Sequence, residues 1–400
     1  MSAIWSIWSV SCPVSQPFDL IVVGGGISGL TAAYRGKQRG WNVLLLESSA
    51  RLGGSLETER HQGTLQELGA ESMVTAKPWG RELCHELGLH DQLVSPQAEY
   101  RRTLIVRSGR LRPIPEGLRL LAPSQWLPFL RSPAVSWVGK LRMACEFVVP
   151  ARRSQEDESL ADFVRRRLGR EALERIAQPL VAGIYTADPE TLSMRATLPQ
   201  FVDYEQNFGS VCRGLLTSPE ARASSGPRYQ LFCSLRGGFQ QLIDRLHEAI
   251  GQDTFKLGHS VQSIAPTESG WKVDGWTTRR LVVAVPTYRA STLVQGWDAA
   301  LAALLQRVEY LSSATVNLVY PLSAVDRSTR AFGFVVPSIE KRDILACTFS
   351  HRKYPGRTSP DVALLRAYVG GAHRPEAMQW SDPEMVERSH TELASLLGIK

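Results

Sequence analysis

The chain has 400 residues, of which 43% are hydrophobic and 21% charged, and its net charge is +7. This length and hydrophobic content are enough for a large core and for two or three domains. Its six cysteines form no C-x-x-C pair, which argues against a zinc site and a disulfide framework and agrees with a reducing compartment. No run of 18 apolar residues is free of charge, so a membrane-spanning helix is not expected.

The N-terminal segment, residues 1–17, contains two tryptophans but no Lys or Arg. It therefore lacks the basic start of a secretory signal peptide. We expect residues 1–17 to be a disordered leader.

A glycine-rich turn follows the first predicted strand, Phe18–Val23, in the sequence VVGGGISGLTAAY (22–34). A helix that starts in this turn offers free N–H groups and partial positive charge to an anion. A second apolar strand, 42–46, ends at Glu47, which can accept a hydrogen bond from a ribose hydroxyl. This order predicts a dinucleotide site, the alternative being an ordinary glycine-rich loop. The predicted binding residues are Gly24, Gly25, Gly26, Ile27, Ser28, Gly29, Glu47 and Ser48.

The residues after Glu47 favour FAD over NAD. ESSARLGGSLETE (47–59) adds a second glycine turn, and QELGAESMV (66–74) adds two more small residues. An NAD domain needs no such extension, whereas a longer cofactor whose flavin reaches a second domain does. We predict non-covalent FAD, no metal, and further cofactor-binding residues at Arg51, Gly53, Gly54, Ser55, Gly69, Ala70, Glu71 and Ser72.

Positive charge is concentrated in residues 101–170, which hold 15 Lys and Arg against 6 Asp and Glu, a local charge of +9. The other 330 residues have a net charge of −2. The basic segment interleaves Trp126, Phe129, Trp137 and Phe147 with aliphatic residues and contains no nucleic-acid-binding motif. Such a surface suits an anionic membrane, the alternative being a helical domain with a solvated basic face. We expect a cytoplasmic protein, peripherally associated with the membrane, that binds no nucleic acid.

Further helices are predicted at 78–89, around Leu173 to Leu180, from the glycine doublet at 237–238 to Ile250, and at Asp382–Leu397. Another is predicted to begin after Ser159, which suits the N-cap because an acidic residue, Asp162, follows three positions later. Short strands are predicted within 255–264, 271–274 and 281–285, and residues 311–370 are rich in strands. This order predicts a discontinuous architecture. The expected domains are an FAD-binding domain (18–90 and 229–300), a mainly helical membrane-associating and substrate-entry domain (91–215), and a substrate-binding domain (216–228 and 301–400).

The chain resembles the FAD-dependent amine-oxidase superfamily, in which E-x-x-x-R-x-G-G follows the glycine turn, as Glu47 to Gly54 do here. Within it, the chain is similar to the protoporphyrinogen oxidase family. The similarity extends through 159–201, GRLRPIP (109–115), LRGGFQQL (235–242) and 332–357. The resemblance implies an α/β fold with α+β inserts, namely a Rossmann-like FAD-binding domain of the glutathione-reductase type and a mixed-sheet substrate domain.

The resemblance also implies substrate-site residues. Gly183 aligns with a glycine whose backbone faces the macrocycle, although it also suits a helix C-cap. Phe349 aligns with an aromatic wall of the slot, and Val261 with a residue that contacts the adenine, although both also suit a β core. The family's propionate-binding arginine aligns with Thr103, so Arg101 or Arg102 is expected to replace it.

The sequence contains no familiar hydrolytic or metalloprotease motif, and we identify no catalytic residue. This agrees with a flavin oxidase, because the flavin carries the redox chemistry. The implied activity is oxidation of protoporphyrinogen IX by oxygen. The alternatives are another flavin amine oxidase, a polyene desaturase or a non-catalytic flavoprotein-fold protein, and the oligomeric state stays open, a homodimer included.

The chain stops at Lys400, before a final strand and the G-N-x-x-x-G-x-G-I-like turn typical of the family. The resemblance therefore implies a truncated chain with an unpaired sheet edge and fewer donors for the reduced flavin. We expect weak FAD binding, poor turnover and aggregation unless another chain completes the sheet.

Overall fold

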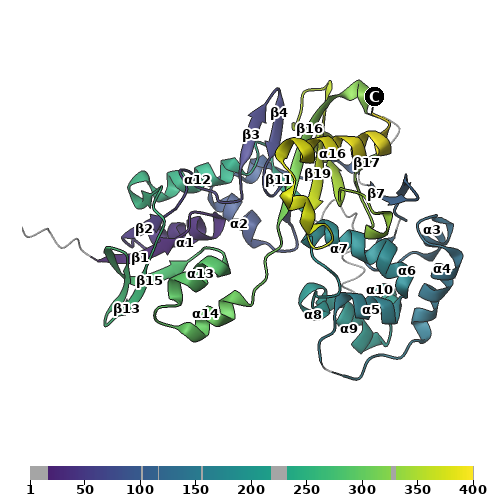
Figure 1. Cartoon of the computed structure of the whole chain (residues 1–400), viewed down its shortest axis with the longest axis horizontal. Coiled ribbons are helices and arrows are strands. Elements are labelled where there is room, and N and C mark those ends of the chain that lie inside the picture. Colours follow the sequence, from purple (N-terminus) through teal and green to yellow (C-terminus); the bar gives the residue numbers. More distant parts are fainter. Residues whose placement is uncertain are drawn as a thin grey trace, which may run out of the picture. The chain divides into compact units, whose positions relative to one another are not determined.

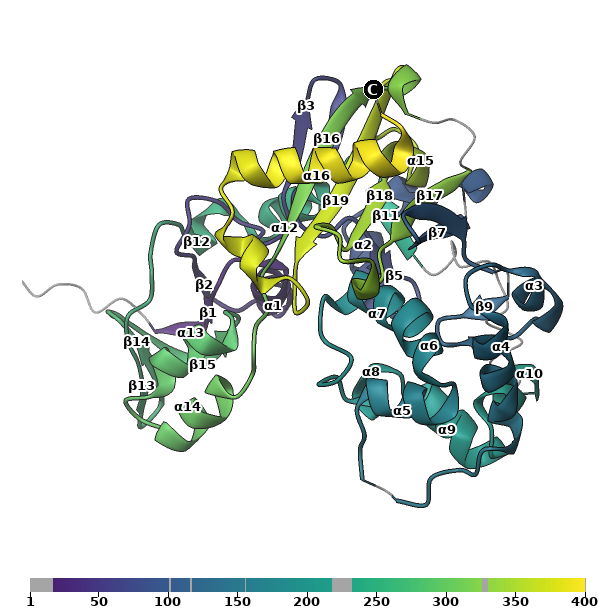
Figure 2. The same ribbon diagram turned by 45° about the vertical axis from the view of Figure 1, so that its right-hand side comes forward.

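The computed structural model describes residues 17–100, 102–115, 117–154, 156–217, 232–325 and 330–399. Contacts divide the chain into two compact units (Figures 1 and 2). The first unit comprises residues 1–57 and 240–309, and the second comprises residues 58–239 and 310–400. The separate membrane-associating domain stays a prediction, and residues 1–16 of the expected leader lie outside the described residues.

A six-stranded sheet forms the first unit, with the strand order β12-β2-β1-β15-β14-β13. The strands β12, β2, β1 and β15 pair in parallel, whereas β13, β14 and β15 form an antiparallel meander. Parallel strands are covered on both faces, which explains why β1 and β2 are nearly continuous apolar runs. The strands are β1 (Phe18–Val23), β2 (Val43–Leu46), β12 (Phe255–Lys256), β13 (Ile264–Thr267), β14 (Gly270–Val273) and β15 (Trp276–Val283).

The helices of the first unit are α1 (Ile27–Gln38), α12 (Gln240–Ile250), α13 (Thr287–Val294) and α14 (Ala299–Gln306). Helix α1 packs against β1, β2 and α12. Helix α12 ends at Ile250 as predicted, and its buried residues recur at helical spacing. The expected α/β order of this part of the chain is therefore confirmed.

A second six-stranded sheet, β16-β19-β18-β17-β7-β8, dominates the second unit. Only β7 and β17 pair in parallel within it. Helix α16 (Asp382–Leu397) has the predicted bounds and contacts β16. The strands are β7 (Arg102–Arg107), β8 (Arg110–Pro113), β16 (Ser313–Pro321), β17 (Ala331–Val335), β18 (Ala346–Phe349) and β19 (Val362–Gly370), the last four in the predicted strand-rich segment.

A helical region of the second unit packs around its own apolar core, which includes Phe129, Phe163 and Phe201. Ser159 Oγ accepts the Asp162 N–H at 3.0 Å, which confirms the predicted N-cap. No helix in the described ranges is long and apolar enough to cross a membrane. The helices are α3 (Trp126–Arg131), α4 (Trp137–Ala144), α5 (Leu160–Arg167), α6 (Arg170–Ala172), a π-helical segment (Leu173–Ala177), α7 (Gln178–Tyr185), α8 (Met194–Thr197), α9 (Pro199–Phe208) and α10 (Val211–Thr217).

Smaller elements connect these parts of the second unit. Helix α2 (Trp79–Glu86) is shorter than predicted, because Leu87 leaves the helix ahead of Gly88, whose φ is +70°. The others are the hairpin β3 (Thr58–His61) and β4 (Thr64–Glu67), the sheet of β5 (Met73–Val74), β11 (Phe232–Leu235) and β6 (Leu93–Val94), the pair β9 (Leu118–Arg119) and β10 (Ala122–Pro123), and α15 (Ser350–Lys353).

Candidate functional site

The glycine turn lies between β1 and α1, as predicted. Gly24 has φ = +106°, and a Cβ there would lie 2.6 Å from the carbonyl oxygen of Ala284 on the neighbouring chain segment. A Cβ on Gly29 would lie 1.9 Å from the carbonyl oxygen of Gly24. Only glycine fits either position, because one needs a left-handed backbone and the other a close approach of helix and strand.

The start of α1 is open to an anion. Gly26 is the N-cap and has extended backbone angles, no side chain caps this end, and the first turn contains no acidic residue. A Cβ on Gly26 would meet only the Gly54 Cα, at 4.0 Å. The helix therefore presents N–H groups and a positive dipole end beside free space, which fits a diphosphate.

Glu47 braces this turn from the end of β2. Its Oε2 accepts the Gly25 N–H at 2.6 Å, and its Oε1 accepts the Ser49 N–H at 2.7 Å. Burial by itself would raise the pKa of Glu47, but these N–H donors hold it below the ordinary value. A carboxylate offers about four acceptor positions, so a ribose hydroxyl can still bind here.

The second glycine turn contacts the first. Gly53 N–H donates to the Gly25 carbonyl at 2.8 Å, and a Cβ on Gly54 would lie 3.1 Å from the Gly26 Cα. Arg51 holds this turn through the carbonyls of Gly54 (2.7 Å) and Leu56 (3.2 Å) and an ion pair with Glu57 (2.7 Å). In this arrangement Arg51 orients backbone, and direct binding of the cofactor by Arg51 stays a prediction.

We expect Glu47→Ala to weaken flavin binding by about 1–3 kcal/mol, because it removes the acceptor of the Gly25 N–H as well as the predicted ribose contact. Flavin titration of the apoprotein by fluorescence quenching measures this. Glu248→Ala, which removes an exposed carboxylate of the same unit on α12, is the matched control. Equal affinity of both variants would contradict the role of Glu47.

The other predicted residues of the first unit surround the two turns. Ser28, Ser48 and Ser55 are exposed, and Ile27 is half-buried at the start of α1. Val261 is half-buried beside the core that contains Ile264 and Val273, so its adenine contact stays a prediction. The structure thus brings together the glycines, Glu47, Ser48, Arg51 and Ser55, which can hold a dinucleotide diphosphate and ribose.

Gly69, Ala70, Glu71 and Ser72 belong to the second unit. The Glu71 carboxylate is buried, where it pairs with Lys353 at 2.8 Å and accepts the Ser350 hydroxyl at 2.5 Å. Burial would raise the pKa of Glu71, but the charges of Lys353 and Arg366 lower it to about 2. Arg366 also donates to the carbonyl oxygens of Glu67 and Gly69. The backbone of 67–72 is therefore fixed by an ion pair of the buried Glu71 and by hydrogen bonds from Arg366.

Lys353→Met should destabilise the protein by about 3–5 kcal/mol near neutral pH, because it leaves Glu71 as a buried charge with one cation fewer. In the wild type, the Glu71 pKa is lowered to about 2, so its contribution is present above the unfolded value of 4.5 and is lost as pH falls from 4.5 toward 2. In the variant the Glu71 pKa rises, so lowering the pH protonates Glu71 and removes the cost of its buried, poorly paired charge. Urea denaturation should therefore show a gap between the two proteins that narrows with falling pH.

The double variant Lys353→Met with Glu71→Leu is the control for this prediction, and it should recover much of the lost stability at neutral pH. A difference in unfolding free energy between the wild type and Lys353→Met that stays constant with pH would contradict the prediction. These buried cations were missed from the sequence, although an arginine inside the apolar strand VALLRAYVG (362–370) is the signal that could have revealed Arg366.

Three of the four predicted substrate residues lie on or against the second sheet. Arg102 pairs with Ala331 at the start of β17, and Gly333 pairs with Thr348, which precedes Phe349 on β18. Arg102 and Phe349 therefore lie at the same end of the sheet, on either side of β17. Gly183 lies at the other end of β17, where its Cβ position would be 3.4 Å from Val335. Arg101 lies outside the described residues.

The surroundings of Gly183 and Phe349 bear on their predicted roles. The C-cap interpretation of Gly183 is wrong, because α7 continues to Tyr185. The Phe349 ring is fully buried and packs edge-on against Phe334, with centroids 6.0 Å apart. Its role as a slot wall stays a prediction, as do the roles of Arg102 and the exposed Gly183.

Comparisons with known proteins agree with this geometry. The model of the family described as flavin containing amine oxidoreductase matches residues 27–400. Coproporphyrinogen III oxidase of Bacillus subtilis (strain 168) is 29% identical over 397 residues, covering 95% of this chain and 83% of the relative. Protoporphyrinogen oxidase 2, chloroplastic/mitochondrial, of Arabidopsis thaliana is 27% identical, covering 95% of this chain and 80% of the relative.

Solved structures show the same fold. A protein from Exiguobacterium sp. 255-15, provisionally named protoporphyrinogen oxidase, matches with a TM-score of 0.82 and 29% identity, covering 95% of this chain and 83% of that chain. A variant of putrescine oxidase matches with a TM-score of 0.69 at 19% identity, covering 95% of this chain and 82% of that chain. The expected α/β amine-oxidase fold is thereby confirmed.

Proposed function

Because the chain belongs to the family of flavin-containing amine oxidoreductases, we propose that it uses non-covalent FAD to oxidise protoporphyrinogen IX to protoporphyrin IX, with oxygen as the electron acceptor. The observation that carries the proposal is the glycine turn braced by Glu47 at the open start of α1. The names of the plant relatives support the substrate.

The residues of the first unit have binding roles in this proposal. FAD, when bound, supplies the hydride acceptor. The N–H groups at the start of α1 bind the diphosphate, Glu47 orients the turn and accepts from the ribose, and Arg51 keeps the second turn in place. In the second unit, Lys353 and Arg366 fix the backbone of 67–72, which carries the remaining predicted cofactor residues.

The substrate's chemistry needs no strong base from the protein. A porphyrinogen must lose a hydride from a methylene bridge and protons from pyrrole nitrogens, and the loss of the hydride acidifies those protons. The described residues contain no cluster that could hold a metal ion. We therefore propose that Gly183, Phe349 and Arg102 position the substrate and that none of them transfers a proton.

A second candidate substrate is coproporphyrinogen III, because relatives from Bacillus subtilis and Propionibacterium freudenreichii carry its name at 29% and 30% identity. Coproporphyrinogen carries four propionates, whereas protoporphyrinogen carries two propionates and two vinyl groups. The number of cationic side chains beside the substrate should therefore decide which porphyrinogen binds, since a buried carboxylate without a cation is strongly unfavourable.

The test is to purify the full chain, reconstitute it with FAD, and add each porphyrinogen without and then with oxygen. Bleaching of the flavin absorbance, followed by porphyrin fluorescence when oxygen is admitted, is the expected result. Flavin binding without bleaching by either porphyrinogen would support a non-catalytic protein. Bleaching by an amine or a polyene instead would support another oxidase or a desaturase.

We also propose that the protein is cytoplasmic and associates peripherally with anionic membranes. The concentration of positive charge in residues 101–170 supports this. A homodimer stays a prediction, which sedimentation of the purified chain would test.

A further inference from the structure

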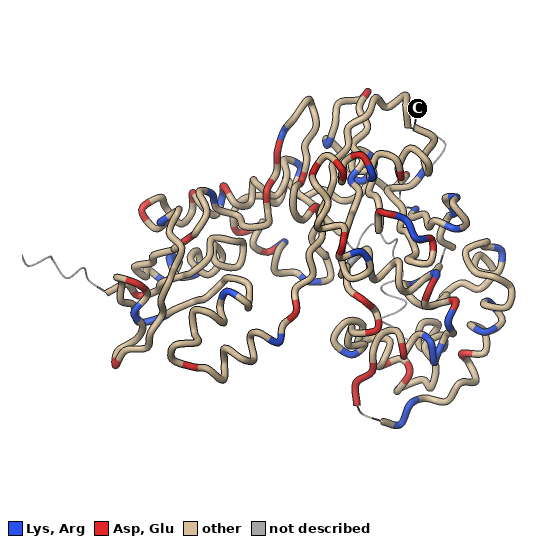
Figure 3. The backbone as a smooth tube through the Cα atoms, in the orientation of Figure 1, with Lys and Arg blue, Asp and Glu red and all other residues tan. Residues whose placement is uncertain are grey.

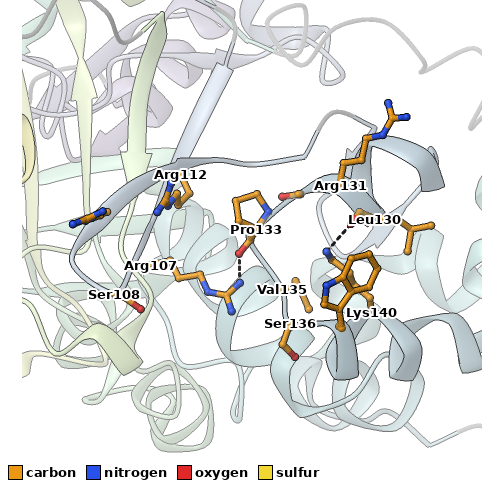
Figure 4. Close-up of a pocket in the computed structure, with 12 residues that line it drawn as sticks. Arg107, Ser108, Arg112, Leu130, Arg131, Pro133, Val135, Ser136 and Lys140 are labelled. Atoms are coloured by element: carbon orange, nitrogen blue, oxygen red, sulfur yellow. Dashed lines mark hydrogen bonds between the residues drawn. The ribbon is translucent and has the colours of Figure 1, made fainter.

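A cavity of about 800 Å³ opens in the helical region of the second unit (Figure 4). The strands β7 and β8 form one side, and α3, α4 and the segment between them form the other. In Figure 4 the Arg107 side chain reaches toward the Pro133 carbonyl, to which it donates a hydrogen bond. The residues that line it are Arg107, Ser108, Arg110, Arg112, Leu130, Arg131, Ser132, Pro133, Val135, Ser136, Trp137 and Lys140.

The lining of this pocket, which we call the β8–α4 pocket, contains five cationic side chains and no carboxylate. Two carboxylates outside the lining accept hydrogen bonds from lining residues. Glu171 accepts the Ser136 N–H at 2.7 Å and the Ser136 hydroxyl. Glu340 accepts the N–H groups of Ser108 and Gly109 and pairs with Arg175 at 3.2 Å. Five cations against these two carboxylates leave the pocket with an excess of positive charge.

Some of the other basic residues of the segment are engaged in ion pairs or hydrogen bonds. Acidic residues accompany the basic ones in α5 and α6, and both kinds are coloured along the backbone in Figure 3. Arg165 and Arg170 pair with acidic side chains, and Arg142 donates to the carbonyls of Arg166 and Arg167 at the end of α5. The pocket gathers five of the fifteen basic residues of the segment 101–170.

Lys140 is the least exposed cation of the pocket, at 5% of its surface. Its ammonium group donates to the Leu130 carbonyl at 2.7 Å and lies 4.2 Å from the centre of the Trp137 ring. Burial and the charge of Arg107 lower the pKa of Lys140, although Glu171 opposes them. None of the ion pairs within the described ranges includes Lys140. A bound anion would relieve this unfavourable arrangement of like charges.

The adjacent surface of α4 is apolar and open to solvent. Trp137, Val138 and Leu141 are 71%, 79% and 69% exposed, and Leu127 of α3 is exposed as well. Their spacing places the three α4 side chains on one face of the helix. An exposed tryptophan beside aliphatic residues is typical of surfaces that enter the membrane interface.

We propose that the β8–α4 pocket binds the phosphate group of an anionic phospholipid headgroup, while Trp137, Val138 and Leu141 contact the lipid's acyl region. This inference rests on the proposed membrane association and makes it specific for a phosphate. The cationic lining matches a phosphate diester, because arginine presents a planar set of donors to phosphate oxygens. The apolar face favours a lipid over a free phosphate ester, which would leave that face in water.

Flotation with vesicles of the phosphate-free neutral lipid digalactosyldiacylglycerol tests the proposal, with phosphatidylglycerol or, at matched surface charge, oleate as the anionic component. We expect saturable binding to phosphatidylglycerol vesicles and weaker binding to oleate vesicles. The variant Arg110→Gln/Arg112→Gln should bind the former about thirty-fold more weakly, equivalent to about 1 kcal/mol for each charge. Arg170→Gln/Arg195→Gln, which changes net charge equally at exposed sites outside the pocket, should bind as the wild type does.

Trp137→Ala should also reduce binding to phosphatidylglycerol vesicles, and brominated lipid should quench wild-type fluorescence more than that of Trp137→Phe. Flavin bleaching by a porphyrinogen should be unchanged in Arg110→Gln/Arg112→Gln, which separates this test from the proposed oxidation. Equal losses in both arginine double variants, or equal binding to oleate and phosphatidylglycerol, would overturn the pocket while leaving membrane association intact. Calorimetric binding of glycerol 3-phosphate without vesicle binding would overturn the lipid as ligand.

Discussion

Gly26→Val should yield a folded protein that binds FAD far more weakly than the wild type does. The backbone of Gly26 is extended, with φ = −71° and ψ = 177°, which a β-branched residue adopts without strain. Its Cβ would point into free space, with only the Gly54 Cα at 4.0 Å. The added methyl groups would occupy the space that the proposed diphosphate needs beside the start of α1. We expect affinity for FAD to fall by about 3 kcal/mol or more, roughly a hundred-fold.

The matched comparison for Gly26→Val is Gly29→Ala, three residues along the same turn. There the new Cβ would lie 1.9 Å from the Gly24 carbonyl oxygen, so helix and strand must separate. Gly29→Ala should therefore lower the unfolding temperature, whereas Gly26→Val should leave it close to the wild-type value and affect only flavin content. Titration with FAD and circular-dichroism melting measure the two effects, and a Gly26→Val protein that binds FAD as tightly as the wild type would refute the assignment of this turn.

The turn could be predicted from the sequence because every part of it is local. The strand, glycines, helix and terminal acid occur within the first 50 residues, and the capping pattern of Ser159 is equally short-range. Sequence also suggested that Glu47 binds ribose, but it gave no sign that Glu47 accepts the Gly25 N–H. That contact depends on how the two parallel strands align, which no local pattern records.

The second sheet could not be assembled from the sequence. Its strands were expected within 311–370, but β7 pairs in parallel with β17 across more than 200 intervening residues. The aromatic residues of the basic segment show the same limit. Phe129 is fully buried and Trp126 packs against Phe147, whereas Trp137 is exposed. All of them occur in similar sequence surroundings, and only tertiary packing distinguishes them.

The arginine run VRRRLGR (164–170) is the strongest example of this limit, because two arginines only two positions apart have opposite environments. Arg165 is exposed and pairs with Asp162, whereas the Arg167 side chain is completely buried. Arg167 follows Leu160, Phe163 and Val164 at helical spacing, so it lies on the apolar face of α5. Consecutive charged residues are usually exposed to solvent, but Arg167 is an exception.

Arg167→Ala should destabilise the helical region by about 3–5 kcal/mol. The guanidinium of Arg167 binds the buried Glu146 carboxylate and donates to the carbonyls of Val149 (2.8 Å), Pro150 (3.2 Å) and Gly209 (3.2 Å). Its removal would leave Glu146 as a buried anion and three carbonyl groups without this donor. Urea denaturation should show the loss, and Arg165→Ala on the same helix should cost less than about 1 kcal/mol, because that arginine is solvated. The double variant Arg167→Met with Glu146→Leu removes both charges and should recover part of the stability. If Arg167→Ala proved no more harmful than Arg165→Ala, the buried pair would not hold this region together.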